Sequence, residues 1–214
     1  MSSSKIIDVE IIEKNPIRDK GFARLTQLVV RNVYEDGTKS EPYFCDAVHR
    51  KPGADDAVVM FLHADICGMP HVVMRRQSRP LLALRGESPT PLGLPAGCVE
   101  PGDDNLVVRA IAEIEEEVGI VLAGQVPLEL GKPLYTSMGW ITEKIHFYEM
   151  LLNESQIQLL KNGVVSQAQG ETMEAGGECR LMSYPKVMRS CKSLMAELGL
   201  RRLRERYYEE HLQG

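Results

Sequence analysis

The chain has 214 residues, with 25 Lys and Arg against 30 Asp and Glu, so its formal net charge is −5. Domains usually hold roughly 100 to 200 residues, so this length fits one domain, alone or with a small extension. A charged fraction of 26% and an apolar fraction of 43% exclude a chain that is disordered throughout. The acidic balance argues against a nucleic-acid-binding protein, but not against a phosphate-bearing ligand held through a divalent cation.

The sequence contains no stretch that approaches the roughly 18 apolar residues of a membrane span, and its first residues, MSSSKIIDVEIIEK, lack the apolar centre of a signal peptide. The five cysteines are scattered and include no CxxC pair, which favours free thiols over a disulfide framework or a zinc site. We therefore expect a cytoplasmic protein that does not enter a membrane.

The N-terminal part predicts a small antiparallel β unit over residues 1–45. Apolar residues alternate imperfectly from Lys5 to Glu13, which predicts a strand, and the turn-like segment Asn15 to Gly21 follows it. A second strand is expected from Phe22 to Tyr34, and the Asp36-Gly37 pair after it is typical of a hairpin. Such a unit is a candidate dimer-forming extension.

The second part of the chain alternates strands, loops and helices. Four prolines between Gly86 and Gly102 predict a loop there, because neither a helix interior nor a central strand tolerates them. The other expected elements are strands over Ala57–Leu62, Pro70–Arg75, Lys144–Leu152 and Cys179–Met182, a polar loop over Gly163–Gly177 and a helix over Pro185–Leu212.

The most informative segment is a helix predicted to begin after Asp103, with Asp103 or Asp104 as its cap, and to end at Gly119. At about 100° per residue, one arc of this helix is apolar and predicts the core face. That arc holds Val107, Ala110, Ile111, Ile114 and Val118.

Three acidic residues lie beside this core face. Glu113 and Glu117 are four apart and share a face, while Glu116 lies further from the core. Like charges at this spacing repel by roughly a few tenths of a kcal/mol, and a hard cation such as Mg²⁺ or Mn²⁺ would reverse that sign. A solvated acidic face without a metal is the alternative interpretation.

Together these residues resemble the signature of the Nudix hydrolases, which begins here with Leu94-Pro95-Ala96-Gly97 and ends with the segment Glu113–Ile120. The resemblance implies an α+β fold, an α/β/α sandwich with a mixed sheet over residues 46–214. Two features depart from the signature: the gap after Gly97 is one residue longer, and Ala112 stands where the family has an arginine that helps to hold the glutamates. Arg109 is either its substitute or an ordinary surface residue.

The resemblance also implies the metal site. Glu113 and Glu117 correspond to the principal ligands of Mg²⁺, or alternatively Mn²⁺, and the carbonyl of Ala96 to a further oxygen ligand. Glu116 corresponds to another ligand or to a group that orients water, so Glu116 and Glu117 are both candidate catalytic residues.

Three further segments resemble the ADP-ribose pyrophosphatase branch of the family: Arg50–Ala54, Val73–Pro80 and Thr136–Lys144. Arg79 and Arg50 carry forked guanidinium groups that suit diphosphate oxygens, and a solvated charge at a strand end is the alternative for each, more so for Arg50. In this branch an aromatic residue at the position of Phe22 stacks on a base, and core packing is the alternative. Glu143 is expected to bind substrate or metal, or else to be merely exposed.

The base that activates water in this branch often comes from the loop after the penultimate strand. Glu174 is closest to that position, but an alignment shifted by one residue places Ala175 there, and Glu171 and Glu178 are rivals.

We therefore expect Mg²⁺-dependent hydrolysis of the diphosphate linkage in a nucleoside diphosphate sugar. ADP-ribose is the first substrate to consider, and its products would be AMP and ribose 5-phosphate. We expect the protein to be a homodimer that binds neither nucleic acid nor a membrane. The alternative is a Nudix-fold module that binds or senses nucleotide sugars without turnover, as Ala112, the longer loop and Gly93 suggest. DNA binding through Lys186–Arg206 is disfavoured, because acidic residues interleave with the basic ones.

Overall fold

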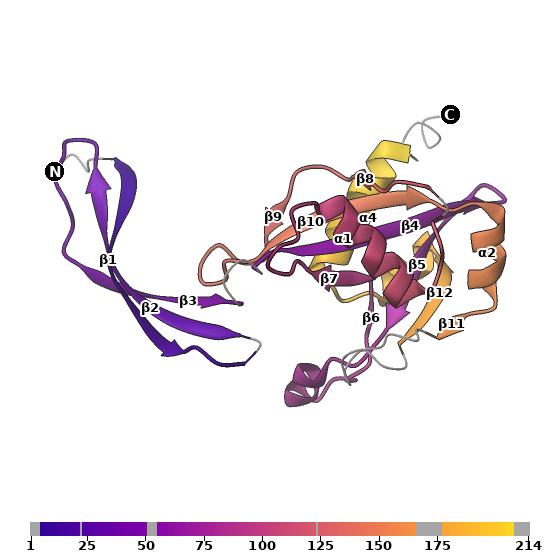
Figure 1. The fold of residues 1–214 in the computed structure, drawn as a ribbon, viewed down its shortest axis with the longest axis horizontal. Coiled ribbons are helices and arrows are strands. Elements are labelled where there is room, and N and C mark those ends of the chain that lie inside the picture. The colour runs from indigo at the N-terminus through magenta and orange to yellow at the C-terminus, as the bar shows by residue number, and fades with distance from the viewer. Residues whose placement is uncertain (1–4, 22, 51–54, 123, 166–176, 208–214) are drawn as a thin grey trace. The chain divides into compact units, whose positions relative to one another are not determined.

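The computed structural model describes residues 5–21, 23–50, 55–122, 124–165 and 177–207. The chain divides into two compact units, which are described separately (Figure 1). The first comprises Met1–Asp56 and Tyr135–Lys144, and the second comprises Ala57–Leu134 and Ile145–Gly214. The division predicted from the sequence, an N-terminal unit over 1–45 and an enzyme domain over 46–214, stays a prediction.

The first unit is built on an antiparallel sheet of three strands, β1 (Ile6–Arg18), β2 (Arg24–Tyr34) and β3 (Tyr43–His49). The hairpin after β2 is confirmed, with Gly37 at a φ of 81°. The turn expected after Glu13 is wrong, because β1 continues through Pro16 and pairs with β2 as far as Arg18. Proline is tolerated there because β1 is an edge strand, where a missing N–H breaks no essential bond.

The larger sheet is mixed, because its central strand β4 (Ala57–Ile66) runs parallel to β10 (Lys144–Leu151) but antiparallel to β5 (Met69–Arg76). Its hydrogen-bonded order is β11-β12-β5-β4-β10-β8, with β6 on β5, β7 on β4 and β9 on β10. The remaining bounds are Leu92–Gly93 (β6), Ala96–Cys98 (β7), Leu128–Glu129 (β8), Leu134–Tyr135 (β9), Val164–Val165 (β11) and Glu178–Ser183 (β12).

The proline-rich segment therefore contains two short strands where only a loop was expected. β6 pairs with the end of β5, and β7 pairs with the start of β4. Each has at most three residues, so Pro91, Pro95 and Pro101 all fall outside the paired positions. This arrangement brings Ala96 and Gly97 to the central strand of the sheet.

The helices are α1 (Leu106–Glu113), α2 (Glu154–Lys161), α3 (Tyr184–Ser190) and α4 (Leu194–Tyr207), with a 3₁₀ helix, η1, over Pro80–Arg85. The single helix expected over Pro185–Leu212 is instead α3 and α4. Cys191 between them is extended, and the hydroxyl of Ser193 accepts the N–H of Ala196 at 3.3 Å, which starts a new helix. Within the described residues, every helix is too short or too polar to cross a membrane.

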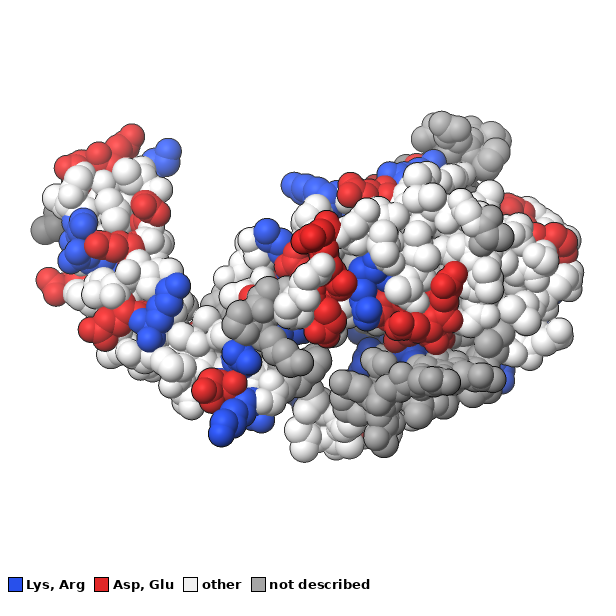
Figure 2. Space-filling view, in the orientation of Figure 1, with Lys and Arg blue, Asp and Glu red and all other residues white. Residues whose placement is uncertain are grey.

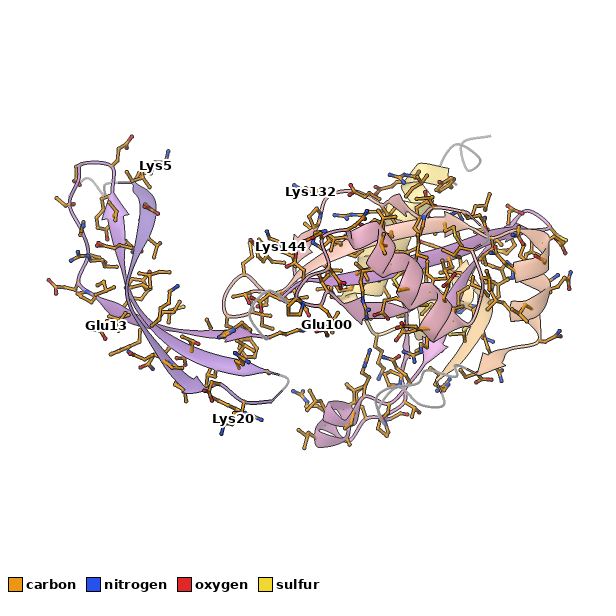
Figure 3. All side chains as sticks on the ribbon, viewed as in Figure 1. Lys5, Glu13, Lys20, Glu100, Lys132 and Lys144 are labelled. Carbon is orange, nitrogen blue, oxygen red and sulfur yellow. The ribbon has the colours of Figure 1, made fainter. Side chains whose placement is uncertain are left out.

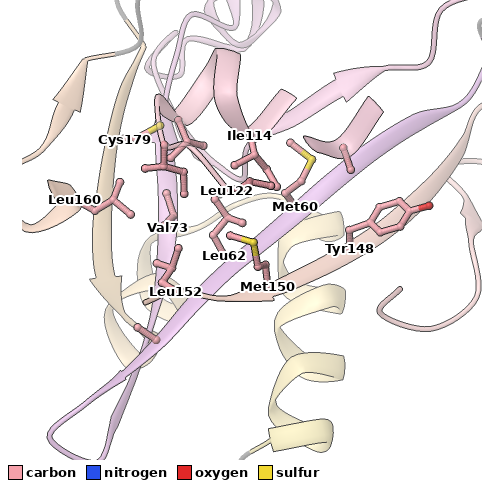
Figure 4. Close-up of a cluster of buried hydrophobic side chains, with 14 of the residues drawn as sticks. Met60, Leu62, Val73, Ile114, Leu122, Tyr148, Met150, Leu152, Leu160 and Cys179 are labelled. Carbon is pink, nitrogen blue, oxygen red and sulfur yellow. The ribbon is translucent and has the colours of Figure 1, made fainter. Parts of the chain in front are cut away.

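Helices cover both faces of the larger sheet. Successive side chains of β4 point to opposite sides, so this strand contributes to a cluster on each face. Met60 and Leu62 belong to a buried cluster that includes residues of α1 and α2, which Figure 4 shows. Val59 and Phe61 belong to the cluster on the other face, with residues of α3 and α4. The expected α+β sandwich with a mixed sheet is therefore confirmed.

Candidate functional site

The helix that carries the acidic residues starts at a cap. The side chain of Asn105 accepts the N–H groups of Val107 at 3.0 Å and Val108 at 3.4 Å. The predicted cap at Asp103 or Asp104 is wrong, because Asp103 instead accepts the N–H of Glu100 at 2.8 Å within the preceding loop. Figure 3 labels Glu100 in that loop.

The apolar face of this helix was predicted correctly. Ala110, Ile114 and Val118 are completely buried, and Val107 and Ile111 pack against the same cluster. The helix ends as expected at Gly119, which has a φ of 73°. Its last turn, η2 (Ile114–Val118), is π-helical.

The acidic residues of this helix separate into two pairs. Glu113 and Glu117 are buried, with 5% and 2% of their surface exposed, whereas Glu115 and Glu116 are exposed. Figure 2 shows acidic side chains gathered on the face of the second unit that carries α1. A buried carboxylate needs a cation or several hydrogen bonds, so the partners of the inner pair decide what this site can do.

Glu113 lies against β7 and is held by an arginine. A Cβ atom placed on Gly97 would be 1.8 Å from Cδ of Glu113, so only glycine leaves room for this carboxyl group. Nη2 of Arg109 donates to Oε1 of Glu113, and Nε of Arg109 donates to the carbonyl of Cys98 at 2.9 Å. Arg109 is therefore a partner of the acidic pair and not an ordinary surface residue.

Glu117 is held from two sides. Its Oε2 accepts the backbone N–H of Ala96 at 2.8 Å, and its Oε1 accepts Nη1 of Arg75. Arg75 lies on β5, is fully buried and also donates to Oε1 of Gln77. Arg75 was not predicted from the sequence, because it follows an apolar run and resembles a charged strand end. The available signal was its alternation with Val73, which puts both side chains on one face of β5.

The site can be tested for its fit to a cation. Within the described ranges, no group of three or more His, Cys, Asp or Glu side chains is arranged around a metal position. Two buried carboxylates nevertheless meet the same short strand, Glu113 at Gly97 and Glu117 at Ala96. Each carboxylate oxygen has two lone pairs, so an oxygen that accepts a guanidinium N–H can also bind a hard cation. Carboxylate oxygens are the kind of donor that a hard divalent cation prefers.

Comparison with solved structures gives the fold. The structure is similar to one described as an ADP compounds hydrolase, with a TM-score of 0.63 and 13% identity over 95% of this chain and 96% of that chain. The chain has a Nudix fold. No protein-family model and no curated protein matches its sequence.

Two further neighbours with the Nudix fold have lower scores. The Nudix domain of Shewanella oneidensis NrtR, complexed with ADP ribose, has a TM-score of 0.47 and 14% identity, covering 71% of this chain and 86% of that one. A mutT/nudix family protein from Listeria innocua has a TM-score of 0.47 and 15% identity, covering 75% and 98%.

The residues that the resemblance to the ADP-ribose pyrophosphatase branch implied lie in several places. In the first unit, Nη2 of Arg50 donates to Oε1 of Glu143, so these two are brought together. In the second unit, Arg79 is exposed, and its backbone N–H donates to the carbonyl of Pro89 at 2.6 Å. Glu178 accepts Nε of Arg180 at 2.6 Å. Outside the described residues lie Phe22, Glu171, Glu174 and Ala175.

Proposed function

We propose that this protein hydrolyses the diphosphate linkage of a nucleoside diphosphate sugar in a Mg²⁺-dependent reaction, and that ADP-ribose is the first candidate substrate. The products would be AMP and ribose 5-phosphate. The observation that carries the proposal is the buried pair Glu113 and Glu117, held against Ala96 and Gly97. Keeping two carboxylates out of water is costly, so such pairs are typical of functional sites.

Each residue then has a defined task. Glu113, Glu117 and the exposed Glu116, with the carbonyl of Ala96, would hold Mg²⁺, or Mn²⁺ in its place. The cation supplies charge neutralisation at the diphosphate and activation of the attacking water. A water would attack one phosphorus while the bond from this phosphorus to the bridging oxygen breaks, and Glu174 would take the proton of that water.

The substrate-binding roles rest on the sequence resemblance. The guanidinium groups of Arg79 and Arg50 would donate to diphosphate oxygens, as forked donors do. Glu143, already paired with Arg50, would orient that arginine or bind the sugar, and Phe22 would stack on the adenine base.

The direct test is hydrolysis of ADP-ribose in excess Mg²⁺, with AMP and ribose 5-phosphate identified as products. Glu117→Gln should lower turnover by at least about 100-fold, because it removes a charged ligand. Glu115→Gln is the matched control: it makes the same change at an exposed position of the same helix and should retain activity. Wild-type activity in the Glu117 variant would refute the metal assignment.

A second candidate is a module that binds nucleotide sugars without turnover. Its support is that each buried carboxylate already has a guanidinium partner, Arg109 at Glu113 and Arg75 at Glu117. The charges are thus balanced without a metal. Calorimetry with ADP-ribose in the presence and absence of Mg²⁺ separates the two functions: tight binding without product release would favour the module.

A homodimer formed through β1 and a cytoplasmic location complete the proposal. Six apolar side chains of β1 are between 41% and 60% exposed: Ile6, Ile7, Val9, Ile11, Ile12 and Ile17. Such an apolar edge strand is normally covered by a partner. Sedimentation should give a dimer, and the double variant Val9→Lys, Ile11→Lys should give a monomer. An unchanged mass would refute this interface.

The proposed cytoplasmic location agrees with the five cysteines, none of which forms a disulfide within the described residues.

A further inference from the structure

Arg75 is a charged residue in a position where the fold calls for an apolar one. It lies on β5 between the pairing partners β12 and β6, opposite Cys179 and Gly93. Val73, on the same face, is part of the core cluster beneath α1. Arg75 itself has no exposed surface and is the largest fully buried side chain of the described residues.

Two buried acceptors hold the Nη1 end of the Arg75 guanidinium group. Nη1 donates to Glu117 and to Gln77, which is also buried. A Cβ on Gly177 would lie 2.8 Å from Nε and 3.0 Å from Nη2 of Arg75, so a larger residue there would displace the group. A buried guanidinium is retained only where its charge is balanced, and Glu117 supplies that balance.

The helix that carries Glu113 has no charged side chain at the position where the Nudix signature has one. The Nudix signature has an arginine where this chain has Ala112, which is half-buried. Ala112 lies two residues before the π-helical turn that carries Glu117. The signature arginine at this place helps to hold the glutamates, and Glu117 is the glutamate that Arg75 contacts from the sheet.

We propose that Arg75 is the positioning residue for Glu117, and that it replaces the missing signature arginine by supplying the same charge from β5 and not from the helix. The inference rests on the proposed function, because it assigns Arg75 a role towards a metal ligand. Arg75 fixes Oε1 of Glu117 while the N–H of Ala96 fixes Oε2, so the carboxylate has a single orientation before any cation binds.

The first test measures thermal stability with Mn²⁺ alone, without substrate. In Arg75→Met, Glu117 loses the guanidinium group that contacts its Oε1, so the melting temperature of the metal-free protein should fall by about 10 °C. Because the carboxylate is no longer held in one orientation, Mn²⁺ should bind this variant more weakly and raise its melting temperature less than that of the wild type. A loss of packing alone would lower the melting temperature but leave the shift caused by Mn²⁺ unchanged.

The second test is kinetic. Arg75→Met should lower kcat by about 10- to 100-fold with little change in KM, because the partner of a ligand is lost and not a substrate contact. Adding Ala112→Arg should restore both kcat and the metal-free melting temperature. Arg76→Met, a change at the exposed neighbour of Arg75, is the matched control and should leave both unchanged.

The outcomes separate the two proposals. A wild-type protein that is neither stabilised by Mn²⁺ nor active would refute the proposed function, and this inference with it. A wild type that responds to Mn²⁺, with an Arg75→Met variant identical to it, would refute the role of Arg75 alone. A folded Arg75→Met, Ala112→Arg double variant whose kcat and melting temperature stay as low as those of Arg75→Met would refute the idea that Arg75 replaces the signature arginine.

If Arg75→Met does not fold, Arg75→Lys provides the test. It keeps the charge but replaces the planar guanidinium group, whose Nη1 donates to both Glu117 and Gln77, by a smaller ammonium group, so kcat should still fall by about tenfold. Wild-type kcat in Arg75→Lys would refute the positioning role.

Discussion

Gly97 and Glu113 are in direct contact, since a Cβ on Gly97 would lie 1.8 Å from Cδ and 1.9 Å from Oε1 of Glu113. The first prediction concerns this contact. Gly97→Ala must push Glu113 away or separate β7 from the helix, so the free energy of unfolding should fall by about 1–3 kcal/mol and hydrolysis by about 100-fold. Urea unfolding and product assays measure both effects. Gly93→Ala, where a Cβ would meet nothing within 4 Å, is the control; equal behaviour of the two variants would contradict the contact.

The second prediction concerns Gly199 of α4, which packs on Phe61. Alanine normally stabilises a helix by about 1 kcal/mol over glycine. A Cβ on Gly199 would however lie 1.8 Å from Cζ of Phe61, whose ring is fully buried. Overpacking should prevail, so Gly199→Ala should destabilise the second unit by about 1–2 kcal/mol in urea unfolding. In a Phe61→Leu background the same change should cost less. A more stable Gly199→Ala protein would show that the helix is not in contact with the ring.

The third prediction concerns pH and the buried Glu149. Burial alone would raise the pKa of Glu149, but hydrogen bonds from His63 at 2.9 Å, Tyr207 at 2.5 Å and Arg206 at 3.1 Å outweigh it and lower the pKa. A lowered folded pKa stabilises the protein above the unfolded pKa of about 4.3, and this stabilisation is lost as the pH falls through the folded value.

Glu149→Gln should therefore be less stable than the wild type at pH 7, by about 2 kcal/mol, and the difference should shrink below about pH 4. Urea unfolding across this pH range measures it. The control is Glu205→Gln, which changes an exposed residue of α4 and should leave the pH profile unaltered. If the difference in unfolding free energy between Glu149→Gln and the wild type did not change with pH, the lowered pKa of Glu149 would be contradicted.

The fourth prediction concerns thiol reactivity. Burial raises the pKa of Cys179 to about 12, and its Sγ donates to the carbonyl of Glu117 at 3.4 Å. Because only the thiolate is nucleophilic, Cys179 should not react with iodoacetamide at pH 8 in the folded protein, but should react in urea. Exposed Cys67 should react in both states. Peptide mass spectrometry identifies the modified residues, and rapid labelling of Cys179 in the native state would contradict its burial.

The helix of the candidate site was predictable from sequence because its signals are local. The apolar residues from Val107 to Val118 recur with the helical period, and Gly119 supplies the left-handed conformation that ends the helix. The cap was misplaced by one or two residues because three consecutive residues, Asp103 to Asn105, all have side chains that can cap. Only the backbone path decides which of them does.

Short strands and helix breaks were predicted less well. β6 and β7 have no periodicity of their own and form only because β5 and β4 offer unpaired backbone groups to them. The break between α3 and α4 depends on the extended backbone at Cys191. Neighbouring elements decide such features, so a local pattern does not contain them.

The sequence by itself determined that Glu113 and Glu117 share one side of a helix, next to its apolar face, because spacing along a helix fixes direction. Only the tertiary structure decided what faces them. Arg75 is 42 residues from Glu117 in sequence, and Gly97 is placed against Glu113 by the pairing of β7 with β4. The charge that balances a buried carboxylate can come from any element that packs against it, and packing between distant segments leaves no periodic signal in the chain.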